Sequence, residues 1–147
     1  MSKENNKIKV AGYIRVSTLS QVKEGESLDG QMEDIKRYAK YKKYKLYKIY
    51  SDEGASGAND NRLGLNELRE GARNGKFKKV IFKRLSRFGR NAKDLLNLYS
   101  EFEEEYNVGL VSLDGKFDTT TPTGKLMRTV LAGIAEFDRE LIIEQMR

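Results

Sequence analysis

Arg15 and Ser17 place a fixed cation and a hydroxyl two residues apart, at the end of the apolar run of residues 8–14. Such a run is typical of a buried β-strand. Ligands bind at the carboxyl ends of strands in open α/β sheets. A serine beside an arginine at this position could therefore attack an anionic group such as a phosphate. Ser17 and Thr18 also fit an ordinary turn, so the rest of the chain must decide.

The chain contains no histidine and no cysteine. The usual zinc sites are therefore excluded, as are Ser-His-Asp and Cys-His catalysis. Catalysis would depend on serine, threonine, tyrosine, lysine, arginine and carboxylate side chains. The lack of cysteine also excludes disulfides and fits the reducing cytoplasm, where we expect the protein.

Composition indicates one soluble globular domain. The 147 residues suffice for a single core, and 34% of them are charged against 38% hydrophobic. We expect no membrane partner, because no apolar segment is long enough to span a bilayer and residues 1–6 lack a signal-peptide core. The net charge of +6 favours a polyanionic partner, nucleic acid first, although that charge alone also fits a basic protein without one.

Hydrophobic patterns predict three strand-helix units and a fourth strand. This order implies an α/β fold with a mostly parallel central sheet flanked by helices. The predicted helices cover residues 28–44, 65–73 and 92–106, with Ser27 or Asp29 capping the first and Asn74-Gly75 ending the second. The predicted strands cover residues 8–14, 45–50, 79–83 and 108–113.

A long C-terminal helix is predicted from about residue 122, with Thr121 as its cap. Its apolar residues are separated by alternating gaps of three and four, a heptad-like seam. The seam suits packing on the sheet, which is the commoner arrangement, or contact between two helices. We expect the helix to continue beyond Arg147 in a longer protein. The seam consists of Met127, Val130, Ile134, Phe137 and Leu141.

Arginines recur in the segments that follow successive strands. In a parallel sheet these segments share one edge, so several guanidiniums could converge on Ser17. Guanidiniums bind phosphate bidentately and stay charged, and phosphoryl transfer depends on positioning and charge stabilisation. A DNA-backbone patch or surface salt bridges are the alternatives, which the presence of several arginines in neighbouring strand-end segments disfavours. The arginines are Arg15, Arg62, Arg84, Arg87 and Arg90.

Residues 8–147 resemble the catalytic domain of serine site-specific recombinases, a group of resolvases, invertases, integrases and transposases. Each shared motif is short, but their order and spacing together are specific. The motifs are Tyr13-x-Arg15-Val16-Ser17-Thr18, Ser27-Leu28-Asp29-x-Gln31, Asp52-x-Gly54-Ala55-Ser56-Gly57, Arg62-x-Gly64-Leu65, Arg87-Phe88-Gly89-Arg90, Thr123-Gly124-x-Leu126-Met127 and Ala135-Glu136-Phe137-x-Arg139-Glu140.

The resemblance implies that Ser17 attacks a DNA phosphodiester, becomes joined to the 5′ end as a phosphoserine, and releases a 3′ hydroxyl. No metal or nucleotide cofactor would be needed, because the phosphoserine conserves the bond energy for rejoining. Gln31 and Asp52 would support the site. We also expect DNA contacts from Arg84 and Arg139. The phosphate would be held by Arg15, Arg62, Arg87 and Arg90.

The family often carries an aspartate where this chain has Ser86, so the general acid and base are unassigned. The loop at residues 19–30 resembles the longer loop of large serine recombinases. Further C-terminal DNA-binding domains, outside this chain, would then read the target sequence, while this domain supplies phosphate contacts. Dimers and tetramers would form through the C-terminal helix.

Two other functions fit parts of the sequence. A magnesium-dependent nuclease or phosphatase could use Asp52, Glu53, Asp114 and Asp118. A non-enzymatic α/β module could bind nucleic acid or oligomerise. A nucleotide-binding domain is disfavoured, because no glycine fingerprint follows the first strand.

Overall fold

The computed structural model describes residues 7–17, 27–54, 62–84, 88–89, 91–114, 118–119, 121–122, 126, 129–130, 132–134 and 136, with the backbone alone for residues 16, 17, 53 and 54. The predicted alternation of strands and helices is present. The elements in chain order are β1 (Lys9–Ser17), α2 (Leu28–Tyr41), β2 (Lys45–Gly54), α3 (Leu63–Arg73), β3 (Lys79–Phe82), α5 (Ala92–Tyr99), the π-helix η2 (Ser100–Glu105) and β4 (Gly109–Ser112).

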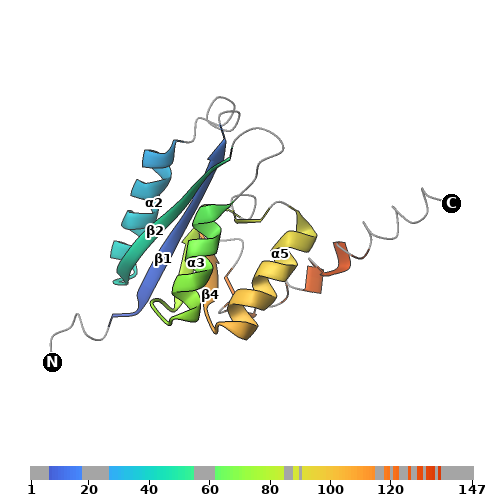
Figure 1. The fold of residues 1–147 in the computed structure, drawn as a ribbon. Helices are drawn as coiled ribbons and strands as arrows, with labels where there is room; N and C mark the ends of the chain where they lie inside the picture. Colours follow the sequence, from blue (N-terminus) through green and yellow to red (C-terminus); the bar gives the residue numbers. More distant parts are fainter. Residues whose placement is uncertain are drawn as a thin grey trace.

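The described strands form a parallel sheet in the order β2-β1-β3-β4, which confirms the predicted parallel α/β sheet (Figure 1). The chain passes from β1 to β2 on one side and then crosses to β3 on the other. The carboxyl ends of β1 and β3 therefore flank the point where the strand order reverses. Open α/β sheets bind their ligands at this point.

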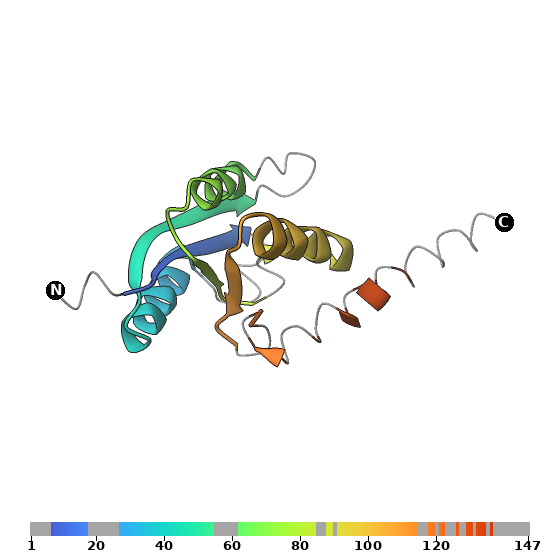
Figure 2. The ribbon, with the colours of Figure 1, turned by 90° about the horizontal axis from the view of Figure 1, so that it is seen from below.

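Helices cover both faces of the sheet (Figure 2). Successive side chains of a strand point to opposite faces. Val10 and Ile14 pack with Ile35 of α2 on one face, whereas Ala11 and Tyr13 lie in the cluster formed with α3 and α5 on the other. Because β1 contributes buried side chains to both faces, it lies in the middle of the domain.

The two strands nearest to the predicted site are longer than the apolar pattern suggested. Pairing between β1 and β2 continues from Ile14↔Ser51 to Ser17↔Gly54. The predicted ends of the strands at residues 14 and 50 were therefore wrong, and residues 51–54 are strand rather than loop. Backbone hydrogen bonds hold these polar residues in the sheet, and hydrophobic patterns do not detect backbone pairing.

Helix boundaries also differ from the predictions. The first helix, α2, ends at Tyr41 because Lys43 adopts a left-handed conformation (φ 60°) that turns the chain into β2. Ser27 caps α2 by accepting a hydrogen bond from the Gly30 amide at 3.0 Å. The predicted third helix is α5 followed by η2. The predicted ends of β3 and β4 were correct to within one residue. The second helix, α3, begins at Leu63 rather than at residue 65 and ends at Arg73, with Asn74 as its C-cap.

The long C-terminal helix stays a prediction. The described residues at positions 122, 126, 129–130, 132–134 and 136 have helical backbone. Val130 and Ile134 of the predicted seam are 46% and 45% exposed, so neither lies in the sheet core. The other seam residues, and Arg139, lie outside the described residues. In the described part of the chain, no helix has the length and apolar character needed to cross a membrane.

Candidate active site

Ser17 is the last residue of the central strand β1, and Arg15 precedes it by two positions. The Cα atom of Ser17 is paired with that of Gly54, and Arg15 is paired with Asp52. The Arg15 side chain is half-buried. The backbone thus brings Ser17 and Arg15 to the carboxyl edge of the sheet, beside the point where the strand order reverses.

Asp52 connects β1, β2 and α3. Its Oδ1 accepts a hydrogen bond from the Gly64 amide at 2.6 Å, and its Oδ2 accepts one from the Leu65 amide at 3.0 Å. These amides belong to the first turn of α3, where N–H groups have no partner within the helix and the helix dipole favours a negative charge. The carboxylate accepts a third hydrogen bond from the Tyr13 hydroxyl on β1, which lies 2.6 Å from Oδ2.

Gly64 allows α3 to begin directly against β2. A Cβ atom at this position would lie 2.8 Å from the carbonyl carbon of Ser51, overlapping its oxygen, and 3.0 Å from Oδ1 of Asp52. Arg62, two residues earlier, adopts a left-handed conformation (φ 41°, ψ 47°). Gly64 is therefore a backbone requirement of this helix start. Arg62 supplies charge there, although its own left-handed conformation is uncommon for a residue other than glycine.

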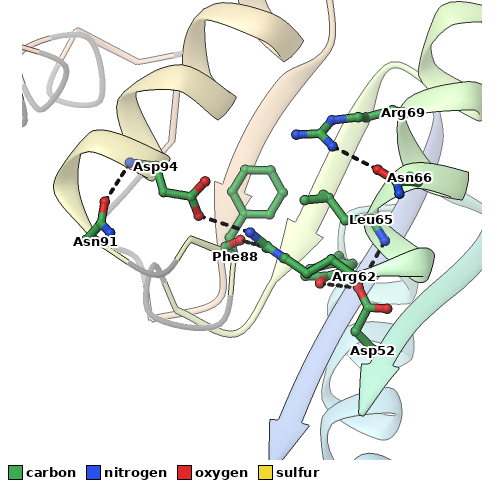
Figure 3. Close-up of polar contacts among 9 residues, drawn as sticks. Asp52, Arg62, Leu65, Asn66, Arg69, Phe88, Asn91 and Asp94 are labelled. Carbon is green, nitrogen blue, oxygen red and sulfur yellow. Dashed lines mark hydrogen bonds and ion pairs between the residues drawn. The ribbon is translucent and has the colours of Figure 1, made fainter. Parts of the chain in front are cut away.

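The Arg62 guanidinium is buried, with 7% of the side chain exposed. Its Nη1 lies 3.0 Å from Oδ2 of Asp94 in the first turn of α5, and its Nη2 donates to the carbonyl oxygen of Phe88 (Figure 3). The guanidinium carbon lies 5.9 Å from the centre of the Tyr13 ring, within the range of a cation–π contact. One side chain thus bridges the start of α3, residue 88 and the start of α5.

Burial and neighbouring groups shift the pKa values of both Tyr13 and Arg62. Burial raises the pKa of the Tyr13 hydroxyl, and the hydrogen bond to Asp52 raises it further, against a smaller opposing effect of Arg62. Burial alone would lower the pKa of Arg62, but the nearby Tyr13 and Asp94 more than offset it, so the pKa is raised. Tyr13 is therefore a neutral donor and Arg62 a permanent cation.

Sequence reasoning missed Asp94, the Tyr13 hydroxyl and the Phe88 carbonyl. One local signal was available for Asp94, because it lies three residues after Asn91, whose side chain caps α5 by accepting from the Asp94 amide at 2.8 Å. Its contact with Arg62 spans 32 residues of sequence. A contact of that range leaves no local pattern in one sequence.

Phe88 lies between the predicted site residues Arg87 and Arg90 in the sequence, and its ring is buried. Its ring stacks on Phe82 at 4.7 Å and meets the edge of Tyr13 at 5.9 Å. Arg87 and Arg90, and Ser86, lie outside the described residues. Phe88 itself packs on side chains of β1 and β3. Arg84 lies two residues after the end of β3 and is half-buried.

Gln31 lies in the second turn of α2 and is 1% exposed. Neither its amide nitrogen nor its amide oxygen has a hydrogen-bond partner among the described residues. A buried amide without partners costs stability. The role predicted for Gln31 in the site stays a prediction.

The acidic residues of the magnesium alternative do not come together. Asp52 is on β2 and Asp114 follows β4, and these strands are the two outer members of the described sheet. Three strand spacings separate them, or about 14 Å. Within the described residues, no three acidic side chains form a group that could hold a metal ion.

The model of the family described as "Resolvase, N terminal domain" matches residues 10–147. The chain belongs to this family. Over 136 residues the domain is 37% identical to the transposon Tn552 resolvase of Staphylococcus aureus. This match covers 91% of the present chain and 61% of that resolvase. The transposon Tn917 resolvase of Enterococcus faecalis is covered to 66%. The chain thus spans less than two thirds of these relatives' length.

Solved structures of family members share the fold. A resolvase-family site-specific recombinase from Streptococcus pneumoniae matches with a TM-score of 0.82 at 38% identity, covering 95% of this chain and 93% of that one. The N-terminal catalytic domain of TP901-1 integrase matches with a TM-score of 0.77 at 34% identity, covering 90% and 98%. The described part of the chain therefore has the same fold as these solved structures.

Proposed function

We propose that this resolvase-family domain catalyses site-specific DNA recombination through Ser17. The serine oxygen attacks a DNA phosphorus and forms a 5′-phosphoserine, while the bond from phosphorus to the 3′ oxygen breaks. The serine loses its proton and the 3′ oxygen gains one, so the step is balanced without a cofactor. The observation that supports this proposal is the position of Ser17 at the end of central β1, with Arg15 two residues earlier.

Arginines supply the positive charge that the reaction needs. In this proposal Arg15, Arg87 and Arg90 hold the phosphate and stabilise the charge that develops on its oxygens. Arg62 is bound to Asp94 and Phe88, so it contributes a fixed positive potential and holds the segment around Phe88 in place. Gln31 supports the site with its unpartnered amide.

Asp52 has a positioning role in this proposal and does not act as the general base. Its carboxylate accepts hydrogen bonds from Tyr13, Gly64 and Leu65. Taking a proton from Ser17 would weaken the start of α3, because a protonated carboxylate is a poorer acceptor. The general acid and base thus stay unassigned, and Ser86 in place of the usual aspartate is consistent with that.

DNA is the proposed substrate, with further phosphate contacts from Arg84 and Arg139. We propose that the C-terminal helix joins copies of the domain into dimers and tetramers through its apolar seam. Sequence-specific recognition belongs, in this proposal, to DNA-binding domains outside these 147 residues. The domain itself then supplies cleavage and rejoining.

Trapping the covalent intermediate tests this function. The full-length protein is incubated with DNA carrying its target site, denatured, and analysed for a phosphopeptide bearing a 5′ nucleotide on Ser17. The wild-type protein should give this species and Ser17→Ala should not. Cleavage that persists in Ser17→Ala and disappears with EDTA would instead establish a metal-dependent nuclease. No covalent species on the target site would overturn the proposal.

A further inference from the structure

A group of lysines lies at the edge of the sheet where the strands begin, opposite to Ser17. This group, which we call the basic edge, comprises exposed residues at the starts of β1 and β2 and in the turns before β2 and β3. Figure 1 shows the starts of β1 and β2 at the same end of the domain. The members of the basic edge are Lys9, Lys42, Lys43, Lys45, Lys76 and Lys78.

Backbone pairing brings three of these lysines together. Lys9 and Lys45 are directly opposite each other on neighbouring strands, and the Lys78 amide donates to the Lys9 carbonyl at 2.7 Å. Adjacent strands are about 4.8 Å apart. Like charges directly opposite each other in a sheet are destabilising. The fold therefore keeps an unfavourable arrangement at this edge.

No acidic side chain offsets this charge in the part of the chain that the structure describes. Several other exposed cations do have partners: Lys36 pairs with Glu33, Arg37 with Asp34 and Arg73 with Glu70. No ion pair among the described residues involves a member of the basic edge. The repulsion would be relieved by an external polyanion.

We propose that the basic edge binds the phosphate backbone of a DNA segment separate from the one at Ser17. The edge spans two strand spacings from β2 to β3, about 10 Å, and DNA presents one charge per about 1.7 Å of its axis, or about six charges over that length. Protein–protein interfaces are depleted of lysine, so an acidic protein is the poorer fit. The choice of DNA rests on the proposed function.

The distance between the two edges supports a separate segment. From Lys9 to Ser17 the central strand β1 makes eight steps, which at about 3.3 Å each is roughly 26 Å. The basic edge and the cleavage site thus lie at opposite ends of β1. Phosphate contacts at both ends would let one domain hold two stretches of DNA, without reading sequence at the basic edge.

Duplex binding by the 147-residue chain tests this proposal. The background carries Ser17→Ala, the DNA is a short duplex of arbitrary sequence, and affinity is measured by fluorescence anisotropy over a series of salt concentrations. The triple variant Lys9→Gln, Lys45→Gln, Lys78→Gln should bind about tenfold more weakly or worse. Its salt slope should fall by about 2.7, because each phosphate contact contributes about 0.9.

The matched control loses the same three charges at paired positions: Lys36→Gln, Arg37→Gln, Arg73→Gln. It should keep most of the affinity and slope. An equal loss in the control would overturn the proposal, and so would competition by polyglutamate as effective as that by DNA. If the first variant unfolds, Lys42→Gln, Lys43→Gln, Lys76→Gln replaces it, since these residues lie in turns. Because no cleavage is measured, failure here is separate from failure to trap a phosphoserine.

Discussion

The Arg62 guanidinium lies 3.0 Å from the Asp94 carboxylate and joins the start of α3 to the start of α5 across 32 residues of sequence. The same guanidinium donates to the Phe88 carbonyl. Asp94 is itself held by its place in the capped first turn of α5. One buried side chain therefore links the start of α3 with Phe88 and with the start of α5.

Asp94→Asn should destabilise the domain. The substitution leaves the buried Arg62 charge without its carboxylate, and breaking a buried ion pair on one side costs about 3 kcal/mol. The free energy of unfolding, measured by urea titration, is the readout. Asp34→Asn is the control, because Asp34 pairs with Arg37 and Lys83 near the surface and should cost less than about 1 kcal/mol. An equal loss of unfolding free energy in the two variants would mean that the Arg62–Asp94 pair stabilises the domain no more than a surface ion pair does.

Gly64→Ala should also destabilise the domain, by about 2 kcal/mol, since a Cβ atom there overlaps the Ser51 carbonyl and such overpacking typically costs 1–3 kcal/mol. Gly133→Ala is the control. Among the described residues, and leaving aside its own helix backbone and chain neighbours, no heavy atom lies within 4 Å of a Cβ at Gly133, and alanine favours helix over glycine. The midpoint temperature of thermal unfolding should therefore fall for Gly64→Ala and stay the same or rise for Gly133→Ala. A tolerated Gly64→Ala would contradict the close approach of α3 to β2.

Tyr13→Phe should change how stability depends on pH. Because the pKa of Tyr13 is raised in the folded protein, its hydroxyl ionises first in the unfolded chain, at about pH 10. The stability that the neutral hydroxyl contributes is thus complete below about pH 10 and is lost as pH rises toward the folded pKa. The variant should be less stable by about 1 kcal/mol at pH 7, and the difference from wild type should narrow above pH 10.

Other tyrosines do not obscure this comparison. The pKa values of Tyr38 and Tyr50 are also raised, chiefly by burial, so the wild-type protein loses stability at high pH for several reasons. Those contributions are the same in both proteins and cancel in the difference. A gap between wild type and Tyr13→Phe that is constant from pH 7 to pH 11 would contradict the role of the Tyr13–Asp52 hydrogen bond.

Arg15→Ala should abolish DNA cleavage by the full-length protein while the domain stays folded. In the proposed reaction the guanidinium acts on the transition-state phosphate, so its loss lowers the rate rather than the stability. Covalent trapping on target DNA measures the first effect and circular dichroism the second. Lys36→Gln, on the exposed face of α2, controls for the loss of one positive charge. Normal trapping by Arg15→Ala would remove Arg15 from the site.

The fold class was predictable because hydrophobic periodicity and the order of elements act locally. Strand-helix alternation predicts a parallel sheet, and the buried residues Ile35 and Ala39 of α2 follow from their spacing. The extension of β1 to Ser17 was not predictable in this way, because interstrand backbone hydrogen bonds hold polar residues as readily as apolar ones.

The candidate site likewise has features that the sequence alone predicts and others that depend on the tertiary structure. The sequence by itself determined which groups were available: a serine and an arginine after an apolar strand, a series of further arginines, and no histidine or cysteine. Only the tertiary structure decided their neighbours. Asp52 is bonded to Tyr13 and to the first turn of α3, and Arg62 is bonded to Asp94. These contacts join segments far apart in the chain, and their energies depend on burial, which exists only after the helices pack on the sheet.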